Sequence, residues 1–130
     1  MKNWILLVED DKDIQASLQD LLEMEGYTVR AAYDGRQALD MLRDCQHLPS
    51  LILLDLVMRG MGGREFRQLQ LQDRRLADIP VVIMSADGEP TGHVEDAGIS
   101  GYLRKPADVN DILDTVARHM RPPVASESTR

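Results

Sequence analysis

WILLVEDD, at residues 4–11, decides the fold class, because it joins an unbroken apolar run to three consecutive acids. Four further short apolar runs lie at residues 28–32, 51–54, 81–84 and 101–103. Apolar residues on consecutive positions are typical of strands that are covered on both faces, as in a parallel sheet. The runs therefore predict a parallel β-sheet buried between two layers of helices.

Segments with helical periodicity separate these runs along the chain. Apolar residues recur with the spacing of a helix face at residues 14–22 and 109–120, and a shorter stripe at 38–42 follows the pair Asp34 and Gln37, which has capping-box spacing. Strands that alternate with helices predict a doubly wound α/β domain. Right-handed crossovers then place helices on both faces of the sheet.

Composition narrows the class of protein. The chain of 130 residues has room for one domain, and the polar segment 121–130 is expected to be a tail or a linker. The formal net charge of −7, from 22 acidic and 15 basic residues, argues against direct nucleic-acid binding. The only cysteine, Cys45, excludes an internal disulfide. The apolar run at 4–8 is too short for a signal peptide or a membrane span, so we expect a cytoplasmic protein without membrane association.

Polar side chains follow the apolar runs at the points where strands are expected to end. Glu9 and Asp10 follow the first run, Asp55 the third, Ser85 the fourth and Lys105 the fifth. Because the carboxyl ends of parallel strands meet at one edge of a sheet, these side chains are expected to gather there. Clustered carboxylates need a neutralising cation, and oxygen ligands without nearby Cys or His favour Mg²⁺.

Four motifs, each at a strand end and in this order along the chain, carry a family resemblance. They are VEDD at 8–11, LLDLVMRGMGG at 53–63, MSA at 84–86 and YLRKP at 102–106. Together they resemble the response-regulator receiver domain of two-component signalling. The resemblance implies one receiver domain at residues 1–120, with a flavodoxin-like, five-stranded parallel sheet in the order 2-1-3-4-5.

The same resemblance implies roles for individual residues. Asp55 is expected to accept a phosphoryl group from a sensor histidine kinase or a phosphotransfer protein. Lys105 and the Ser85 hydroxyl would bind the phosphoryl oxygens. Ser85 and Tyr102 would form the conformational switch, with the aromatic ring changing rotamer when the hydroxyl moves toward the phosphate.

The metal site implied by the family is a Mg²⁺ site made by Glu9, Asp10, Asp55 and the backbone carbonyl of Val57. Physical chemistry agrees with this set, because Mg²⁺ takes one or two carboxylates and keeps positions for waters and a phosphoryl oxygen. A carboxylate beside Mg²⁺ and a lysine stays ionised, as attack on phosphorus requires.

The expected product is a conformation that controls a downstream protein target, so the chain is expected to be a signalling module rather than a turnover enzyme. The resemblance also leaves room for a phosphorylation-dependent dimer. Two alternatives stay open: a receiver-like interaction domain that works without phosphorylation, and a small aspartyl-phosphate phosphatase. Phosphatases of the haloacid dehalogenase type usually have a second acid two residues after the nucleophile, where this chain has Val57.

Two departures from the family pattern stand out. Arg59 replaces a common proline, and we hypothesise that it pairs with Asp10 or Asp11 and competes modestly with Mg²⁺. Between Ser85 and Lys105, glycines and a proline interrupt any periodic pattern. Because both residue types disfavour helix interiors, the fourth helix is predicted to be short or irregular.

Overall fold

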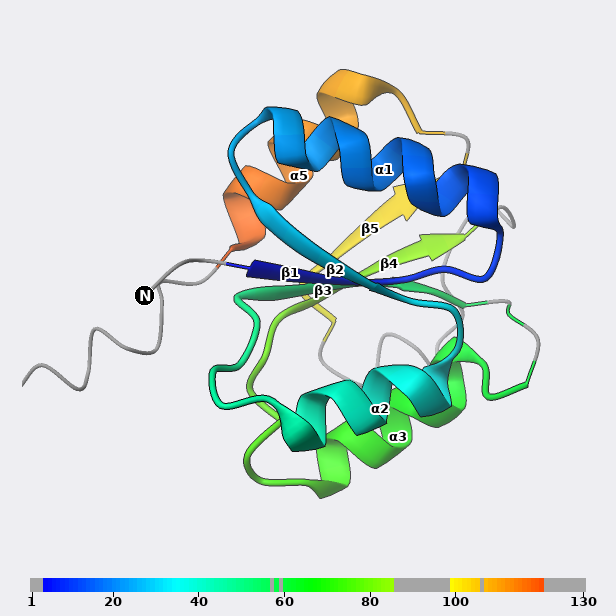
Figure 1. The fold of residues 1–130 in the computed structure, drawn as a ribbon, viewed down its shortest axis with the longest axis vertical. Coiled ribbons are helices and arrows are strands. Elements are labelled where there is room, and N and C mark those ends of the chain that lie inside the picture. Colours follow the sequence, from blue (N-terminus) through cyan, green and yellow to red (C-terminus); the bar gives the residue numbers. More distant parts are fainter. Residues whose placement is uncertain (1–3, 57, 59, 86–98, 106, 121–130) are drawn as a thin grey trace, which may run out of the picture.

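The structure is a computed structural model that describes residues 4–56, 58, 60–85, 99–105 and 107–120. Strands and helices alternate along most of the chain (Figure 1). In chain order the elements are β1 (Trp4–Val8), α1 (Lys12–Met24), β2 (Thr28–Ala32), α2 (Gly35–Asp44), β3 (Leu51–Asp55), α3 (Gly63–Gln72), β4 (Val81–Ser85), β5 (Gly101–Arg104) and α5 (Val109–His119).

The strands form one parallel sheet in the order β2-β1-β3-β4-β5, which confirms the predicted topology. Every residue of β1, β3 and β4 is buried, as the unbroken apolar runs predicted for strands covered on both faces. The register aligns Val8 with Leu54 and Asp55 with Met84. The ends of these three central strands therefore lie side by side.

Helices cover both faces of the sheet: α1 and α5 lie on one face, and α2 and α3 on the other (Figure 1). Alternate residues of a strand point to opposite faces, so β1 supplies two separate cores. Ile5 and Leu7 pack into the core beneath α1 and α5. Leu6 and Val8 pack into the core beneath α2 and α3.

Side-chain caps fix where α1 and α2 begin, next to the carboxyl edge of the sheet. The Asp11 carboxylate accepts hydrogen bonds from the backbone N–H groups of Asp13 and Ile14 at the start of α1. At the start of α2, Asp34 accepts from the Gln37 N–H, and the Gln37 side chain accepts from the Tyr33 N–H at 2.8 Å. The capping pair predicted from sequence is thus confirmed.

Several sequence-based predictions concern residues beyond this description. The predicted short or irregular fourth helix concerns residues 86–98, and the predicted tail or linker concerns residues 121–130. Two further predictions concern the single residues Val57 and Arg59. All of these positions lie outside the described residues. Among the helices that are described, none is both long and apolar enough to cross a membrane.

Candidate functional site

Three carboxylates meet where β1 and β3 end. Glu9 and Asp10 follow β1, and Asp55 is the last residue of β3. One carboxylate oxygen from each lies within 4.8 Å of the other two. Glu9 and Asp55 are buried, at 1% and 4% exposure, whereas Asp10 is half-buried. Hard oxygen donors at this spacing, without His or Cys in the group, fit a cation such as Mg²⁺.

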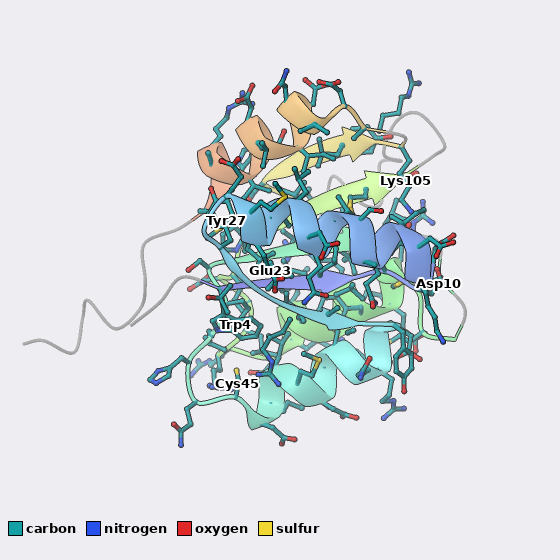
Figure 2. The ribbon with its side chains drawn as sticks, turned by 45° about the horizontal axis from the view of Figure 1, so that its top comes forward. Trp4, Asp10, Glu23, Tyr27, Cys45 and Lys105 are labelled. Carbon is teal, nitrogen blue, oxygen red and sulfur yellow. The ribbon has the colours of Figure 1, made fainter. Side chains whose placement is uncertain are left out.

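Lys105 completes this cluster from the end of β5. Its Nζ lies 2.7 Å from Glu9 Oε1 and 3.0 Å from Asp55 Oδ2. Its backbone N–H donates to the Ser85 carbonyl at 2.9 Å, which ties the residue to the end of β4. Figure 2 shows Asp10 and Lys105 at the same edge of the sheet. The ammonium is therefore held between two buried carboxylates.

Burial and charge act against each other in this cluster. Burial raises the pKa of Glu9, and the hydrogen bonds from Lys105 and from the Asp11 N–H reduce this rise without cancelling it. Burial alone would lower the pKa of Lys105, but its hydrogen bonds to Glu9 and Asp55 and the charges of both acids raise it overall. Lys105 is consequently a cation throughout the neutral range.

Glu9 is held by hydrogen bonds to Asp11, to β2 and to α1. The Asp11 N–H donates to Glu9 Oε2 at 3.1 Å, and the Glu9 N–H donates to the Ala32 carbonyl at 3.0 Å. Gln15 Nε2 donates to the Glu9 carbonyl at 2.9 Å and to the Ala32 carbonyl at 3.3 Å. Sequence reasoning missed Gln15, because a glutamine in the first turns of a helix is an ordinary solvent-facing residue until the topology brings two strand ends beneath it.

The two predicted switch residues lie on the neighbouring strands. Ser85 is buried at the end of β4, between the ends of β3 and β5 in the sheet order. Tyr102, on β5, packs against the core beneath α2 and α3. Its buried hydroxyl has no hydrogen-bond partner among the described residues. The structure thus brings Glu9, Asp10, Asp55 and Lys105 together and places Ser85 beside them.

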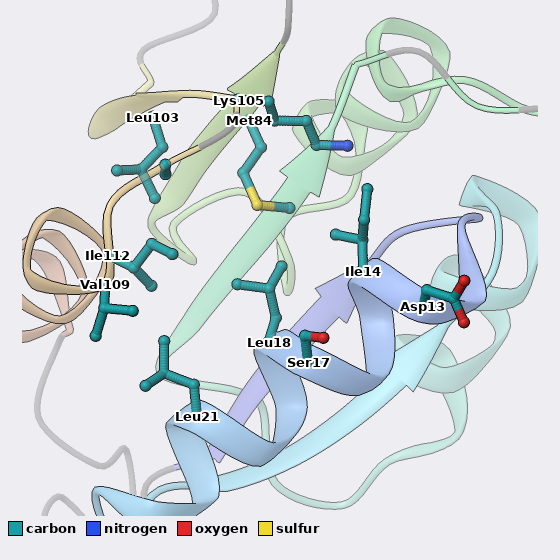
Figure 3. A pocket seen from close by; sticks show the side chains of 11 residues that line it. Asp13, Ile14, Ser17, Leu18, Leu21, Met84, Leu103, Lys105, Val109 and Ile112 are labelled. Atoms are coloured by element: carbon teal, nitrogen blue, oxygen red, sulfur yellow. The ribbon is translucent and has the colours of Figure 1, made fainter.

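A pocket of about 750 Å³ adjoins the cluster between α1 and α5 (Figure 3). Its floor is apolar, with Leu18 from α1 and Ile112 from α5 on opposite sides. Lys105 lines the end of the pocket that is nearest to the acidic cluster. The three acids of that cluster, Glu9, Asp10 and Asp55, do not line the pocket. The pocket is therefore a neighbouring hollow that shares one residue with the acidic cluster.

Comparison with known proteins gives a consistent result. The response regulator receiver domain family matches residues 5–117. The chain is 36% identical over 119 residues to the DNA-binding dual master transcriptional regulator RpaA of Synechocystis, covering 90% of this chain and 48% of that protein. It is 35% identical over 121 residues to the transcriptional regulatory protein CpxR of Escherichia coli, covering 92% and 50%. The chain spans about half the length of these curated relatives.

Solved structures share the fold over about nine tenths of the chain. The chemotaxis response regulator CheY4 of Vibrio cholerae has a TM-score of 0.84 at 25% identity, over 92% of this chain and 100% of that chain. The phosphorylated cyanobacterial phytochrome response regulator RcpA has a TM-score of 0.77 at 30% identity, over 89% of both chains.

Proposed function

Because the chain belongs to the response regulator receiver domain family, as its four motifs predicted, we propose that Asp55 accepts a phosphoryl group in a Mg²⁺-dependent reaction. The donor is a sensor histidine kinase or a phosphotransfer protein. One observation carries the proposal: the Asp55 carboxylate shares a cluster with two further acids and accepts a hydrogen bond from Lys105. The proposed nucleophile, the proposed metal ligands and the Lys105 counter-charge therefore lie together at one edge of the sheet.

In this proposal Glu9, Asp10 and Asp55 hold the cation, together with the Val57 carbonyl. A bound divalent cation would neutralise charge on the phosphoryl oxygens, which is the main demand of phosphoryl transfer. An Asp55 carboxylate oxygen attacks phosphorus as the bond from phosphorus to the donor's histidine nitrogen breaks. The electron pair of that bond stays with the leaving imidazole.

Lys105 and Ser85 act on the transferred group. The Lys105 ammonium, now shared between two carboxylates, moves to pair with a phosphoryl oxygen of the modified Asp55. The Ser85 hydroxyl donates to another phosphoryl oxygen. Movement of Ser85 opens space that the Tyr102 ring fills, so that a local electrostatic event changes the surface around β4 and β5.

The output is control of a downstream partner rather than turnover of a substrate. RpaA and CpxR are named as transcriptional regulators, and for this chain we infer regulation through protein contact by one receiver domain at residues 1–120. A net charge of −7 does not favour direct contact of this domain with DNA phosphates. We place the reaction in the cytoplasm, and residues 121–130 stay a predicted tail or linker.

Intact mass spectrometry after incubation with Mg²⁺ and acetyl phosphate tests the proposal. The wild type is expected to gain a single phosphoryl adduct, which is absent in Asp55→Asn and when EDTA replaces Mg²⁺. Continuous phosphate release from unrelated monoesters would instead identify a phosphatase. Absence of any adduct, even with a cognate kinase, would favour an interaction domain that works without phosphorylation.

A further inference from the structure

The loop that follows Asp55 is attached to the start of α2. The Gly35 N–H donates a 3.0 Å hydrogen bond to the Met61 carbonyl on this loop. At the base of the same loop, the Gly63 N–H donates to the Leu56 carbonyl at 3.1 Å. The loop is thus closed at its base and held at its outer part by a second helix.

The contact at Gly35 has no space for a side chain. A Cβ atom on residue 35 would lie 2.8 Å from Met61 Cγ. It would lie 3.0 Å from the Met61 carbonyl oxygen and 3.0 Å from Met61 Sδ. Distances below 3.0 Å between such atoms require something to move. Glycine therefore fits this close approach, and a Cβ at position 35 would require the Met61 side chain, and to a smaller extent its carbonyl, to shift.

The same turn also contacts the segment that contains the other two acids. The Ala32 carbonyl, at the end of β2, accepts from the Glu9 N–H and from the Gln15 side chain. Residues 32–35 consequently touch the Glu9 segment at one end and the Asp55 loop at the other. This turn therefore adds a second connection between the two acid-bearing segments, besides the direct pairing of β1 with β3.

We propose that Gly35 is a positioning residue for divalent-cation binding, acting through its hydrogen bond to the Met61 carbonyl on the loop after Asp55. The inference rests on the proposed function, since it assumes that the acidic cluster binds Mg²⁺. Mg²⁺ demands near-ideal octahedral geometry, so a shift of one ligand-bearing segment weakens binding. Groups that orient metal ligands commonly affect affinity without touching the ion.

Gly35→Pro removes the donor, adds a Cβ that meets Met61, and keeps the helix. Gly35 is the first residue of α2, a position at which proline is well tolerated. The preceding Asp34 has φ −160° and ψ 176°, the extended backbone that a following proline favours. We expect Mg²⁺ affinity to fall by about three- to tenfold or more, because the variant loses one hydrogen bond and also displaces Met61, with little change in the urea midpoint.

Val109→Pro is the matched control, because Val109 is the first residue of α5 and its preceding residue, Asp108, is also extended. Titration with Mg²⁺ alone, followed by amide chemical shifts, reports both the dissociation constant and the fold of each variant. Val109→Pro should bind Mg²⁺ like the wild type. Equal affinities for Gly35→Pro and Val109→Pro would overturn the inference and leave the proposed metal site intact.

Gly35→Ala provides a second test that keeps the N–H donor. The added Cβ should weaken Mg²⁺ binding by displacing Met61, and adding Met61→Ala should restore part of the affinity by removing Cγ and Sδ. Loss of affinity in Gly35→Ala without recovery in the double variant would contradict the Met61 contact. If the wild type shows no saturable Mg²⁺ binding, the proposed metal site itself fails, and the inference with it.

Discussion

Lys105→Met tests whether the lysine neutralises the acidic cluster in the metal-free protein. Methionine keeps an unbranched side chain, with a thioether in place of one methylene, and lacks the ammonium, which leaves Glu9 and Asp55 without their counter-charge. Breaking a fully buried ion pair costs roughly 3–5 kcal/mol. Because the Lys105 side chain is 20% exposed, water replaces part of the lost interaction. We expect the free energy of unfolding to fall by about 2 kcal/mol.

Urea unfolding in EDTA, followed by circular dichroism, measures this loss. Lys12→Met is the control, since Lys12 is an exposed lysine at the start of α1 and its loss should change stability by no more than about 0.5 kcal/mol. A Lys105→Met variant as stable as Lys12→Met would refute the reasoning. That result would mean that the two buried acids need no counter-charge in the folded state.

Mg²⁺ provides an independent check on the same charge. With the ammonium gone, the cluster should bind Mg²⁺ more tightly, because one repelling cation is absent. Ligand at ten times its dissociation constant adds about 1.4 kcal/mol to stability. At one fixed Mg²⁺ concentration, Lys105→Met should therefore gain more stability than the wild type. A smaller gain would show that Lys105 assists metal binding instead of opposing it.

Three further predictions use the same unfolding and titration measurements. The pKa of Lys105 is raised in the folded state, so the stability that the ammonium contributes is complete below pH 10.5 and is lost as the pH rises through the folded pKa. In urea unfolding at a series of pH values above 10.5, the wild type should therefore lose this stability, and Lys105→Met should not. Gly63→Ala places a Cβ 2.6 Å from the Asp55 carbonyl oxygen and should destabilise the fold by about 1–3 kcal/mol, whereas an unchanged urea midpoint would contradict this contact. Arg59→Pro should tighten Mg²⁺ binding, and unchanged or weaker affinity would reject competition by the arginine.

The strand ends were predictable because one physical signal defines them. A run such as Leu51 to Leu54 is buried on both faces, so the first carboxylate after it must stand at the sheet edge. The parallel topology then brings Asp55 beside Glu9 without further information. Asp10 and Lys105 were found in the same way, and their roles in chemistry stay predictions.

Contacts that hold the site were not predictable from sequence. The hydrogen bond from Gly35 to Met61 joins the start of α2 to the loop after β3, and no periodicity or motif marks it. The bond from Gln15 to the Glu9 and Ala32 carbonyls depends on how α1 lies over the ends of two strands. Such contacts arise from the relative placement of loops, which local patterns do not encode.

Charge balance explains why a divalent cation suits this edge. Three carboxylates and one ammonium leave two negative charges, which a monovalent ion balances only in part. In the proposed reaction, a phosphoryl group on Asp55 replaces one negative charge with nearly two, so the cation and Lys105 would both be needed after transfer. In the same reaction, Lys105 would then exchange a carboxylate for a phosphoryl oxygen while its backbone N–H stays bound to the Ser85 carbonyl. This hydrogen bond joins the end of β5 to the end of β4, where the Ser85 hydroxyl is proposed to bind the same phosphoryl group.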